Sequence, residues 1–260
     1  GATIIEEWLP DDALAAAGTS REEALKNQEL PQYGTGMYNS MIYPMRGLAI
    51  KGILWYQGES NVNATSDYIA LYQQYAKLYR ELFEDETLPI ITTQLVKFYD
   101  ASRPDWARFR VTQWQAAASD DHSYIVCGID FGDRNNIHPN DKLPYGTRAA
   151  ELALHEVYGM DTPGESAYPL KVDRQGNRVT ITFENAESGL LLSEGENIRE
   201  LYGRTADGDA VLLSAELKGD TLVTEVPETV TSIEYAMSYM PEGNLYTGNG
   251  LPAAPFSLDL

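Results

Sequence analysis

Short buried strands alternate with amphipathic helices over the first 160 residues, and this alternation constrains the fold more than any other feature. Brief apolar runs bounded by turn residues predict the strands, whereas apolar side chains that recur every three or four positions predict the helices. The predicted strands are residues 49–55, 88–96 and 124–129, and the predicted helices are residues 68–82, 106–117 and 146–158. Alternating strands and helices predict an α/β fold, with a parallel sheet covered by helices.

The pattern changes beyond residues 161–164, where Asp, Thr, Pro and Gly follow one another. Val179, Ile181 and Phe183 alternate with threonines, which is the period-two pattern of a half-buried strand. Turn-forming residues recur at 175–177, 206–208 and 218–220. Short strands separated by such turns predict a small antiparallel β-sandwich.

The chain of 260 residues is long enough for one large domain or two modest ones. The change of pattern favours two: an α/β domain over residues 1–160 and a β-sandwich domain over residues 164–238. Residues 239–260 are rich in Pro, Gly and Asn and show no periodicity. We expect them to form an ordered loop that packs back on the first domain.

The composition excludes several classes of function. Nineteen Lys and Arg residues against thirty-nine Asp and Glu residues give a net charge of −20, which repels nucleic acid and anionic membranes. No apolar run approaches the ~18 residues of a transmembrane helix. The single Cys127 excludes an internal disulfide and a cysteine-based metal site, and three histidines give little support for zinc. No metal is therefore expected. No glycine-rich phosphate loop is present, so a nucleotide cofactor is not expected either.

The segment Trp-Tyr-Gln-Gly-Glu-Ser-Asn, residues 55–61, follows a predicted buried strand. In open α/β sheets, ligands bind at the carboxyl ends of the strands. Polar side chains around Gly58 could therefore donate hydrogen bonds to a developing oxyanion. A polar turn that caps the next helix explains the segment equally well. Ser60 departs from a nucleophile elbow, because the second glycine of that motif is missing.

A second polar loop, residues 130–139, follows the third predicted strand and contains His138. Residues that can orient a ring flank this histidine, which favours a general base over a purely structural histidine. His122 precedes a strand in an acidic turn, and His155 lies within a predicted helix. We therefore favour His138 as the catalytic histidine.

These segments resemble the conserved blocks of the SGNH hydrolases, in the carbohydrate-esterase branch that includes the sialate O-acetylesterases. Residues 55–61 resemble the third block, and Asn-Asn-Ile-His-Pro-Asn-Asp-Lys, residues 135–142, resembles the final, histidine-bearing block. Residues 1–8 are similar to the second block, and residues 241–256 resemble the closing segment. The resemblance implies a three-layer α/β/α fold with a parallel sheet whose N-terminal part is missing, followed by the β-sandwich.

The resemblance also implies an activity, the hydrolysis of acetyl esters by a serine nucleophile with His138 as its base. Gly1 would supply a backbone N–H to the oxyanion, and Gln57 or Asn61 a side-chain amide. Glu59 would order the loop rather than react. Many members of the superfamily carry an aspartate three residues before the histidine, where this chain has Asn135. Asp133 or a backbone carbonyl is expected to orient His138 instead.

The nucleophile of this family lies in a Gly-Gln-Ser-Asn block upstream of the second block. No matching serine exists in residues 1–260, so we expect it in an N-terminal segment or on a partner chain. Hydrolysis by Ser60 itself, with His138, is an alternative. A further alternative is a carbohydrate-binding or structural fragment of the same fold, without catalysis.

The substrate implied by the resemblance is an O-acetylated sugar, with 9-O-acetyl sialic acid first and acetylated xylan as the alternative. An acidic sugar fits poorly with a net charge of −20. A local positive group such as Arg134 or Arg110 is then expected beside it. One cysteine and an acidic surface favour a secreted or periplasmic protein over a cytoplasmic one.

Overall fold

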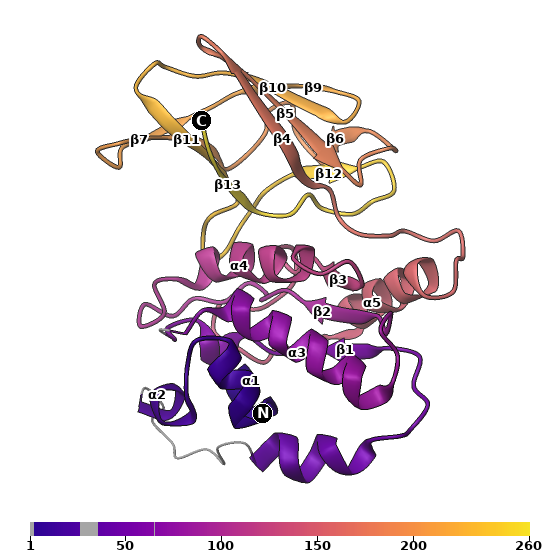
Figure 1. Ribbon diagram of the computed structural model, residues 1–260. Helices are drawn as coiled ribbons and strands as arrows, with labels where there is room; N and C mark the ends of the chain where they lie inside the picture. Colours follow the sequence, from indigo (N-terminus) through magenta and orange to yellow (C-terminus); the bar gives the residue numbers. More distant parts are fainter. Residues whose placement is uncertain (1–2, 27–35, 65) are drawn as a thin grey trace. The chain divides into compact units, whose positions relative to one another are not determined.

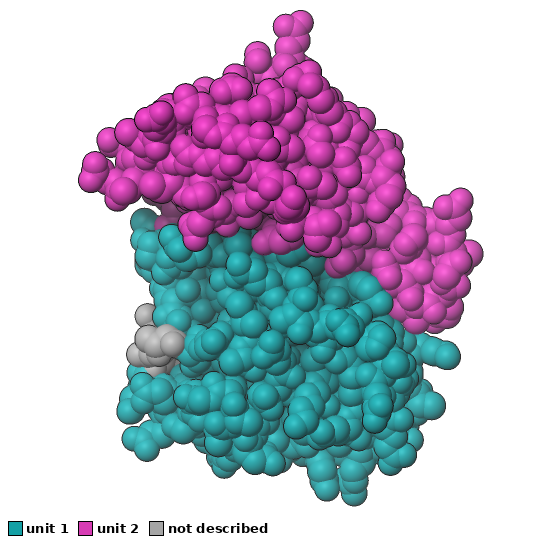
Figure 2. Space-filling model, turned by 45° about the horizontal axis from the view of Figure 1, so that its top comes forward, with its two compact units in different colours: residues 1–95, 101–125 teal, residues 96–100, 126–260 magenta. Residues whose placement is uncertain are grey.

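A computed structural model describes residues 3–26, 36–64 and 66–260. The chain divides into two compact units, which Figure 2 colours separately. Unit 1 contains residues 1–95 and 101–125, and unit 2 contains residues 96–100 and 126–260. Each unit is described by itself. The domain boundaries expected near residues 160 and 239 stay a prediction.

The core of unit 1 is a three-stranded parallel sheet, as the alternating pattern predicts (Figure 1). Its strands, in sheet order, are β1 (Ile53–Trp55), β2 (Ile90–Thr93) and β3 (Ser123–Val126). Strand β1 pairs in parallel with β2, with Ile53 opposite Ile90. The α/β class with a parallel sheet is confirmed.

Two long helices connect these strands, because parallel neighbours need a crossover connection. They are α3 (Tyr68–Phe83), between β1 and β2, and α4 (Trp106–Ala118), between β2 and β3. The predicted positions of both helices are confirmed. The Asp67 carboxylate caps α3 by accepting hydrogen bonds from the backbone N–H groups of Ile69 and Ala70.

Aromatic side chains hold these two helices in place. The rings of Tyr68 and Phe109 meet at 4.8 Å between centroids, so α3 and α4 pack against each other (Figure 1). The Tyr75 ring lies 4.5 Å from the Trp55 ring, which packs α3 on β1. The aromatic stripe of α3 therefore belongs to the core and does not form a ligand platform.

Short helical segments precede and follow β1 in unit 1. They are η1 (Ile5–Trp8), α1 (Asp11–Ala16), α2 (Arg21–Lys26), η2 (Tyr38–Ile42), η3 (Tyr43–Met45) and η4 (Glu59–Asn61). Segment η1 lies close to α3, and the Trp8 ring packs edge-on against the Trp55 ring at 5.6 Å. The N-terminal segment thus contributes to the same core as β1.

Unit 2 contains helix α5 (Leu143–Glu156) followed by antiparallel sheets (Figure 1). One sheet has the order β4-β5-β10-β9, with β4 (Tyr168–Gln175), β5 (Arg178–Glu184), β9 (Ala215–Lys218) and β10 (Thr221–Glu225). A second has the order β13-β11-β7-β8, with β7 (Leu201–Thr205), β8 (Ala210–Leu212), β11 (Val230–Tyr235) and β13 (Phe256–Asp259). Strands β6 (Leu190–Leu192) and β12 (Leu245–Thr247) pair with each other.

The period-two pattern of the second half is confirmed. Val179, Ile181 and Phe183 are buried in β5, whereas the residues between them are more exposed. The Phe183 ring contacts the Phe256 ring of β13 at 5.8 Å, which joins the two four-stranded sheets. The predicted turn at residues 175–177 connects β4 to β5, and Gly176 adopts a φ of 62° there.

The expectation of a loop over residues 239–260 is wrong in one respect, because the segment contains β12 and β13. These strands pair with β6 and β11, which are distant in the sequence. Each strand is only three or four residues long and flanked by Pro or Gly, so its period-two pattern is too short to recognise. The Tyr239 carbonyl also accepts a hydrogen bond from the Phe98 N–H.

No helix within residues 3–26, 36–64 and 66–260 is long and apolar enough to cross a membrane.

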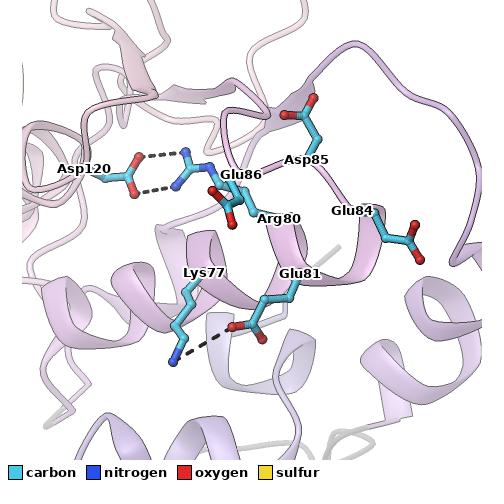
Figure 3. A pocket seen from close by; sticks show the side chains of 7 residues that line it. All are labelled: Lys77, Arg80, Glu81, Glu84, Asp85, Glu86 and Asp120. Atoms are coloured by element: carbon cyan, nitrogen blue, oxygen red, sulfur yellow. Dashed lines mark hydrogen bonds and ion pairs between the residues drawn. The ribbon is translucent and has the colours of Figure 1, made fainter.

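A partly buried ion pair joins the end of α3 to the turn before β3. The Arg80 guanidinium donates to both carboxylate oxygens of Asp120, at 2.5 and 2.7 Å (Figure 3). Its Nε donates to the Leu88 carbonyl at 3.1 Å. A pocket of about 490 Å³ opens beside this pair, lined also by Lys77 and by four acidic residues between 81 and 86. Its lining contains no histidine, serine or cysteine, so it offers no acyl-transfer chemistry.

This ion pair predicts a pH-dependent contribution to stability. Burial raises the pKa of Asp120, but hydrogen bonds from Arg80, Ser123 and the His122 N–H outweigh burial and lower it below its ordinary value. A carboxyl whose pKa is lowered by folding stabilises the fold at neutral pH, and this contribution is lost in acid. Asp120→Asn should therefore lower the free energy of unfolding by about 1–2 kcal/mol at pH 7.

Urea unfolding at pH 7 and at pH 3 measures this difference. The gap between the wild type and Asp120→Asn should narrow as the pH falls below about 4. Asp121→Asn, an exposed neighbouring change, should show no such gap. A gap that stays constant down to pH 3 would contradict the role of the ionised carboxylate.

Candidate active site

The loop after β1 approaches helix α4 closely at Gly58, where there is no room for a side chain. Gly58 has a φ of 153°, and a side chain there would approach Gln113 Nε2 to 2.7 Å and the Phe109 ring to 3.1 Å. Gln113 Nε2 donates to the Gln57 carbonyl at 3.0 Å, and its Oε1 accepts from the Leu95 N–H at 2.8 Å. One buried amide thus ties the loop after β1 to the residues after β2.

Glu6 of η1 forms a buried polar network with Gln57 and Asn61 of this loop. Asn61 Nδ2 donates to Glu6 Oε2 at 2.9 Å, and Asn61 Oδ1 accepts from the Ile5 N–H at 3.0 Å. Gln57 Nε2 donates to Asn61 Oδ1 at 2.5 Å and to the Thr3 carbonyl at 3.0 Å. Asn61, Gln57 and Glu6 are 3%, 7% and 3% exposed, so each bond contributes in a low-dielectric environment.

The network distinguishes the two amides that are candidates for the oxyanion. Gln57 has two amide hydrogens, and both are used by Asn61 and the Thr3 carbonyl. Within the described part of the chain, the Asn61 amide nitrogen donates to Glu6 alone. The second amide hydrogen of Asn61 therefore has no acceptor among the described residues, whereas both amide hydrogens of Gln57 are in use. The expected oxyanion role of either side chain stays a prediction.

The other polar residues of the segment 55–61 are more exposed to solvent than Gln57 and Asn61. Glu59 and Ser60 are half-buried in η4, and the Glu59 carbonyl accepts a hydrogen bond from the Arg103 guanidinium. Burial, with a smaller contribution from the Glu59 carboxylate, raises the pKa of Tyr56 to about 12. Tyr56 is 42% exposed, and its hydroxyl stays protonated, so it is a hydrogen-bond donor at this surface.

The histidine loop belongs to unit 2, where a second glycine fixes it. Gly132 has a φ of 117°, and a side chain there would lie 2.3 Å from the Lys97 carbonyl oxygen. The Lys97 N–H donates to the Phe131 carbonyl at 2.7 Å, and the Asp133 N–H donates to the Lys97 carbonyl at 3.2 Å. The loop therefore begins in direct contact with residues 96–100.

Asx turns shape the loop between Gly132 and the histidine. Asp133 Oδ1 accepts from the Asn135 N–H at 2.7 Å, and Asn136 Oδ1 accepts from the His138 N–H at 2.9 Å. The His138 ring is exposed. Within residues 3–26, 36–64 and 66–260, neither Asp133 nor another carboxylate bonds to that ring. The roles of His138 as base and of Asp133 as its partner stay predictions.

The sequence analysis did not identify Arg148, whose side chain binds the residues at the start of this loop. Arg148 of α5 donates to both carboxylate oxygens of Asp130, each at 2.9 Å, and to the Cys127 carbonyl at 2.9 Å. Its guanidinium also lies 4.3 Å from the Phe131 ring centroid. No local pattern relates Asp130 to a residue eighteen positions later, so only the folded chain brings them together.

The predicted site residues fall in both units. Gln57, Glu59 and Asn61 lie in unit 1, and Asp133 and His138 lie in unit 2. Gly1 lies outside the described residues. Arg110 is fully buried and donates from Nε to the Leu95 carbonyl at 2.9 Å, so its expected contact with an acidic sugar is wrong.

Comparison with known proteins assigns the class. The family model described as "Carbohydrate esterase, sialic acid-specific acetylesterase" matches residues 2–152, and the chain belongs to that family. It is 26% identical to the sialate O-acetylesterases of Homo sapiens and Pongo abelii, over 98% of this chain and 55% of each relative. The chain thus spans about half the length of these relatives.

The chain is also similar in structure to a carbohydrate acetylesterase. The crystal structure of a carbohydrate acetylesterase from Xanthomonas citri matches with a TM-score of 0.86 and 26% identity. The match covers 100% of this chain and 59% of that protein. The fold described above is therefore one that a carbohydrate acetylesterase adopts.

The buried network generates one prediction. In Asn61→Asp, a carboxylate that cannot donate when ionised faces the Glu6 carboxylate across 2.9 Å. The free energy of unfolding should fall by about 2 kcal/mol at pH 7, and part of the loss should be recovered at pH 5, where one carboxyl can hold a proton. Chemical unfolding at both pH values measures this. Asn177→Asp, at an exposed turn, is the control. Equal losses in the two variants would contradict the network.

A second prediction concerns the stability of the histidine loop. Gly132→Ala should lower the free energy of unfolding by about 2 kcal/mol or more, because its methyl group collides with the Lys97 backbone. Gly146→Ala is the matched control, since Gly146 is helical and a methyl group there meets open space. Thermal unfolding compares the two. A Gly132→Ala protein as stable as the control would show that the close approach does not hold the loop.

Proposed function

We propose that this chain carries the oxyanion-stabilising and base-bearing parts of a carbohydrate O-acetylesterase. Family membership supports the reaction class, and the likeness to a carbohydrate acetylesterase supports the fold. The observation that carries the proposal is the buried Asn61 amide at the carboxyl end of β1, held by Glu6 and Gln57. Ligands of open α/β sheets bind at this end of the strands.

The proposed chemistry is serine-histidine catalysis on an SGNH-like three-layer scaffold. His138 takes the proton of a serine hydroxyl as the serine oxygen attacks the acetyl carbonyl carbon. The Asn61 N–H stabilises the negative charge that develops on the carbonyl oxygen. His138 then gives the proton to the sugar oxygen as the C–O bond breaks. Water, activated by His138, releases acetate from the acyl-serine and restores both groups.

We propose that the nucleophilic serine lies outside residues 1–260, on a segment upstream or on a partner chain. The share of the relatives' length that this chain spans is compatible with that placement. Ser60 is the alternative within the chain, although Gly-Glu-Ser-Asn lacks the glycine after the serine that an elbow requires. A secreted or periplasmic location is part of the same proposal.

The proposed substrate is an O-acetylated sugar, with 9-O-acetyl sialic acid first and acetylated xylan second. The printed names of the family and of the curated relatives support the first. The broader name of the structural relative, carbohydrate acetylesterase, is compatible with both.

The three histidines allow a matched test in the protein that contains this chain. His138→Ala should reduce kcat for acetate release by about a thousandfold or more, because the base and the proton donor are lost together. His122→Ala and His155→Ala should leave kcat within about twofold. Acetate release from 9-O-acetyl sialic acid and from 4-nitrophenyl acetate measures both effects. Retained activity in His138→Ala would exclude it as the base.

Ser60→Ala separates the two placements of the nucleophile. The proposal expects this variant to keep measurable turnover, whereas complete loss with an intact fold would assign the nucleophile to Ser60. An absence of acetate release from every acetyl ester, by the wild type with its upstream segment, would favour a non-catalytic carbohydrate-binding protein and overturn the proposal.

A further inference from the structure

An exposed cation and two aromatic rings form a cluster beside the histidine loop in unit 2. The Arg134 guanidinium carbon lies 4.6 Å from the centroid of the Tyr99 ring. The Tyr99 ring in turn meets the Tyr239 ring at 5.1 Å, with an interplanar angle of 68°. Tyr99 is 45% exposed, and Arg134 is also exposed. These three residues are called the Tyr99–Arg134–Tyr239 cluster.

Backbone hydrogen bonds fix the cluster, so it does not depend on side-chain packing alone. The Tyr99 N–H donates to the Arg134 carbonyl at 3.1 Å, and the Phe98 N–H donates to the Tyr239 carbonyl at 3.3 Å. The contact of Gly132 with Lys97 holds the same two segments together two residues earlier. Three separate parts of the chain are therefore joined at this point.

A half-buried carboxylate anchors the third segment. Glu200 Oε1 accepts from the Ser238 hydroxyl at 3.2 Å, and Glu200 Oε2 accepts from the Glu242 N–H at 3.1 Å. The two donors lie on either side of Tyr239 in the sequence. Both Glu200 oxygens thus accept hydrogen bonds from residues 238–242, and no ion pair between Glu200 and Arg134 is present among the described residues.

Arg134 has no carboxylate partner among the described residues, unlike three other arginines of the chain. Arg80, Arg148 and Arg204 each pair with a carboxylate at 2.9 Å or less. In the described ranges of a chain with a net charge of −20, Arg134 has no such partner, and its neighbour Asp133 bonds to the Asn135 N–H. An exposed guanidinium over a ring still has N–H groups that can bind a planar carboxylate with two hydrogen bonds.

The position of the cluster relates it to the proposed chemistry. Arg134 precedes His138 by four residues on one short loop, and the Asx turns at Asp133 and Asn136 set the path between them. A ligand group held by Arg134 is therefore bound to the same rigid loop that carries the proposed base.

We propose that the Tyr99–Arg134–Tyr239 cluster is a subsite for the carboxylate and ring of an acidic O-acetylated sugar. Arg134 binds the carboxylate, and the tyrosine rings contact the apolar face of the sugar. The inference rests on the proposed function for its link to acetyl esters. It names the residues that would favour an acidic over a neutral sugar, and their contact with the carboxylate can be measured without turnover.

A binding experiment on the 260-residue chain tests the subsite directly. The ligands are N-acetylneuraminate and its methyl ester, which share the ring but differ in the carboxylate charge. Ligand-observed NMR titration should give a Kd for the acid about fivefold lower than for the ester. In Arg134→Gln, the acid should bind only as weakly as the ester. Arg134→Lys should fall between, because it keeps the charge but loses the fork.

Arg108→Gln is the matched control, since Arg108 is an exposed arginine of α4 whose nearest carboxylate oxygen is 3.9 Å away. It should leave both Kd values unchanged. Thermal unfolding of each variant confirms that the fold is intact. Equal binding of acid and ester by the wild type, no binding of either, or an unchanged preference in Arg134→Gln would each overturn the subsite.

Turnover distinguishes failure of the subsite from failure of the proposed function. In the protein that contains this chain, Arg134→Gln should raise KM for 9-O-acetyl sialic acid about fivefold and leave kcat, and both constants for acetylated xylose, unchanged. Acid-selective binding that Arg134→Gln abolishes, without hydrolysis of any acetyl ester, would support the subsite and reject the esterase. If the enzyme hydrolyses both sugars and Arg134→Gln changes KM equally for both, the esterase proposal stands and the subsite is rejected.

Discussion

The carboxamide of Asn61 lies buried between the Glu6 carboxylate and the Gln57 amide, and the first half of the site depends on it. This side chain receives hydrogen bonds from Gln57 and from the Ile5 N–H and returns one to Glu6. It therefore fixes η1, the loop after β1 and its own orientation at once. A buried polar group that loses its hydrogen-bond partner costs free energy, so few other side chains can occupy these positions.

The histidine loop depends on a different constraint, a close approach between two backbones. Only a residue without a side chain can stand at Gly132, where the Lys97 carbonyl lies within contact distance of any β-carbon. Arg148 supports the turn before it through Asp130 and the Cys127 carbonyl. The loop that carries the exposed His138 and Arg134 side chains is held at its start by backbone hydrogen bonds to Lys97 and Tyr99.

The local pattern of the chain predicted the parallel strands, the long helices α3 and α4 and the alternating strand β5, because amphipathic periodicity and caps such as Asp67 act over a few residues. It missed β12 and β13, whose three or four residues are too few to show a period. It also identified the loops at 55–61 and 130–139, since polar residues follow buried strands there. It could not identify Glu6 as the partner of Asn61, nor Arg148 as that of Asp130, because those pairs form only in the folded chain. Arg110 was misjudged for the same reason: its charge predicted exposure, whereas its backbone acceptor lies in the core.

The central claim is that residues 1–260 carry the oxyanion donor and the base for a serine that lies elsewhere. The most direct measurement is mass spectrometry of the protein that contains this chain, after reaction with a fluorophosphonate that modifies activated serines. The account predicts a single adduct on a serine outside residues 1–260, formed much more slowly in His138→Ala. An adduct on Ser60 or on another serine of this chain, or no adduct at all, would contradict it.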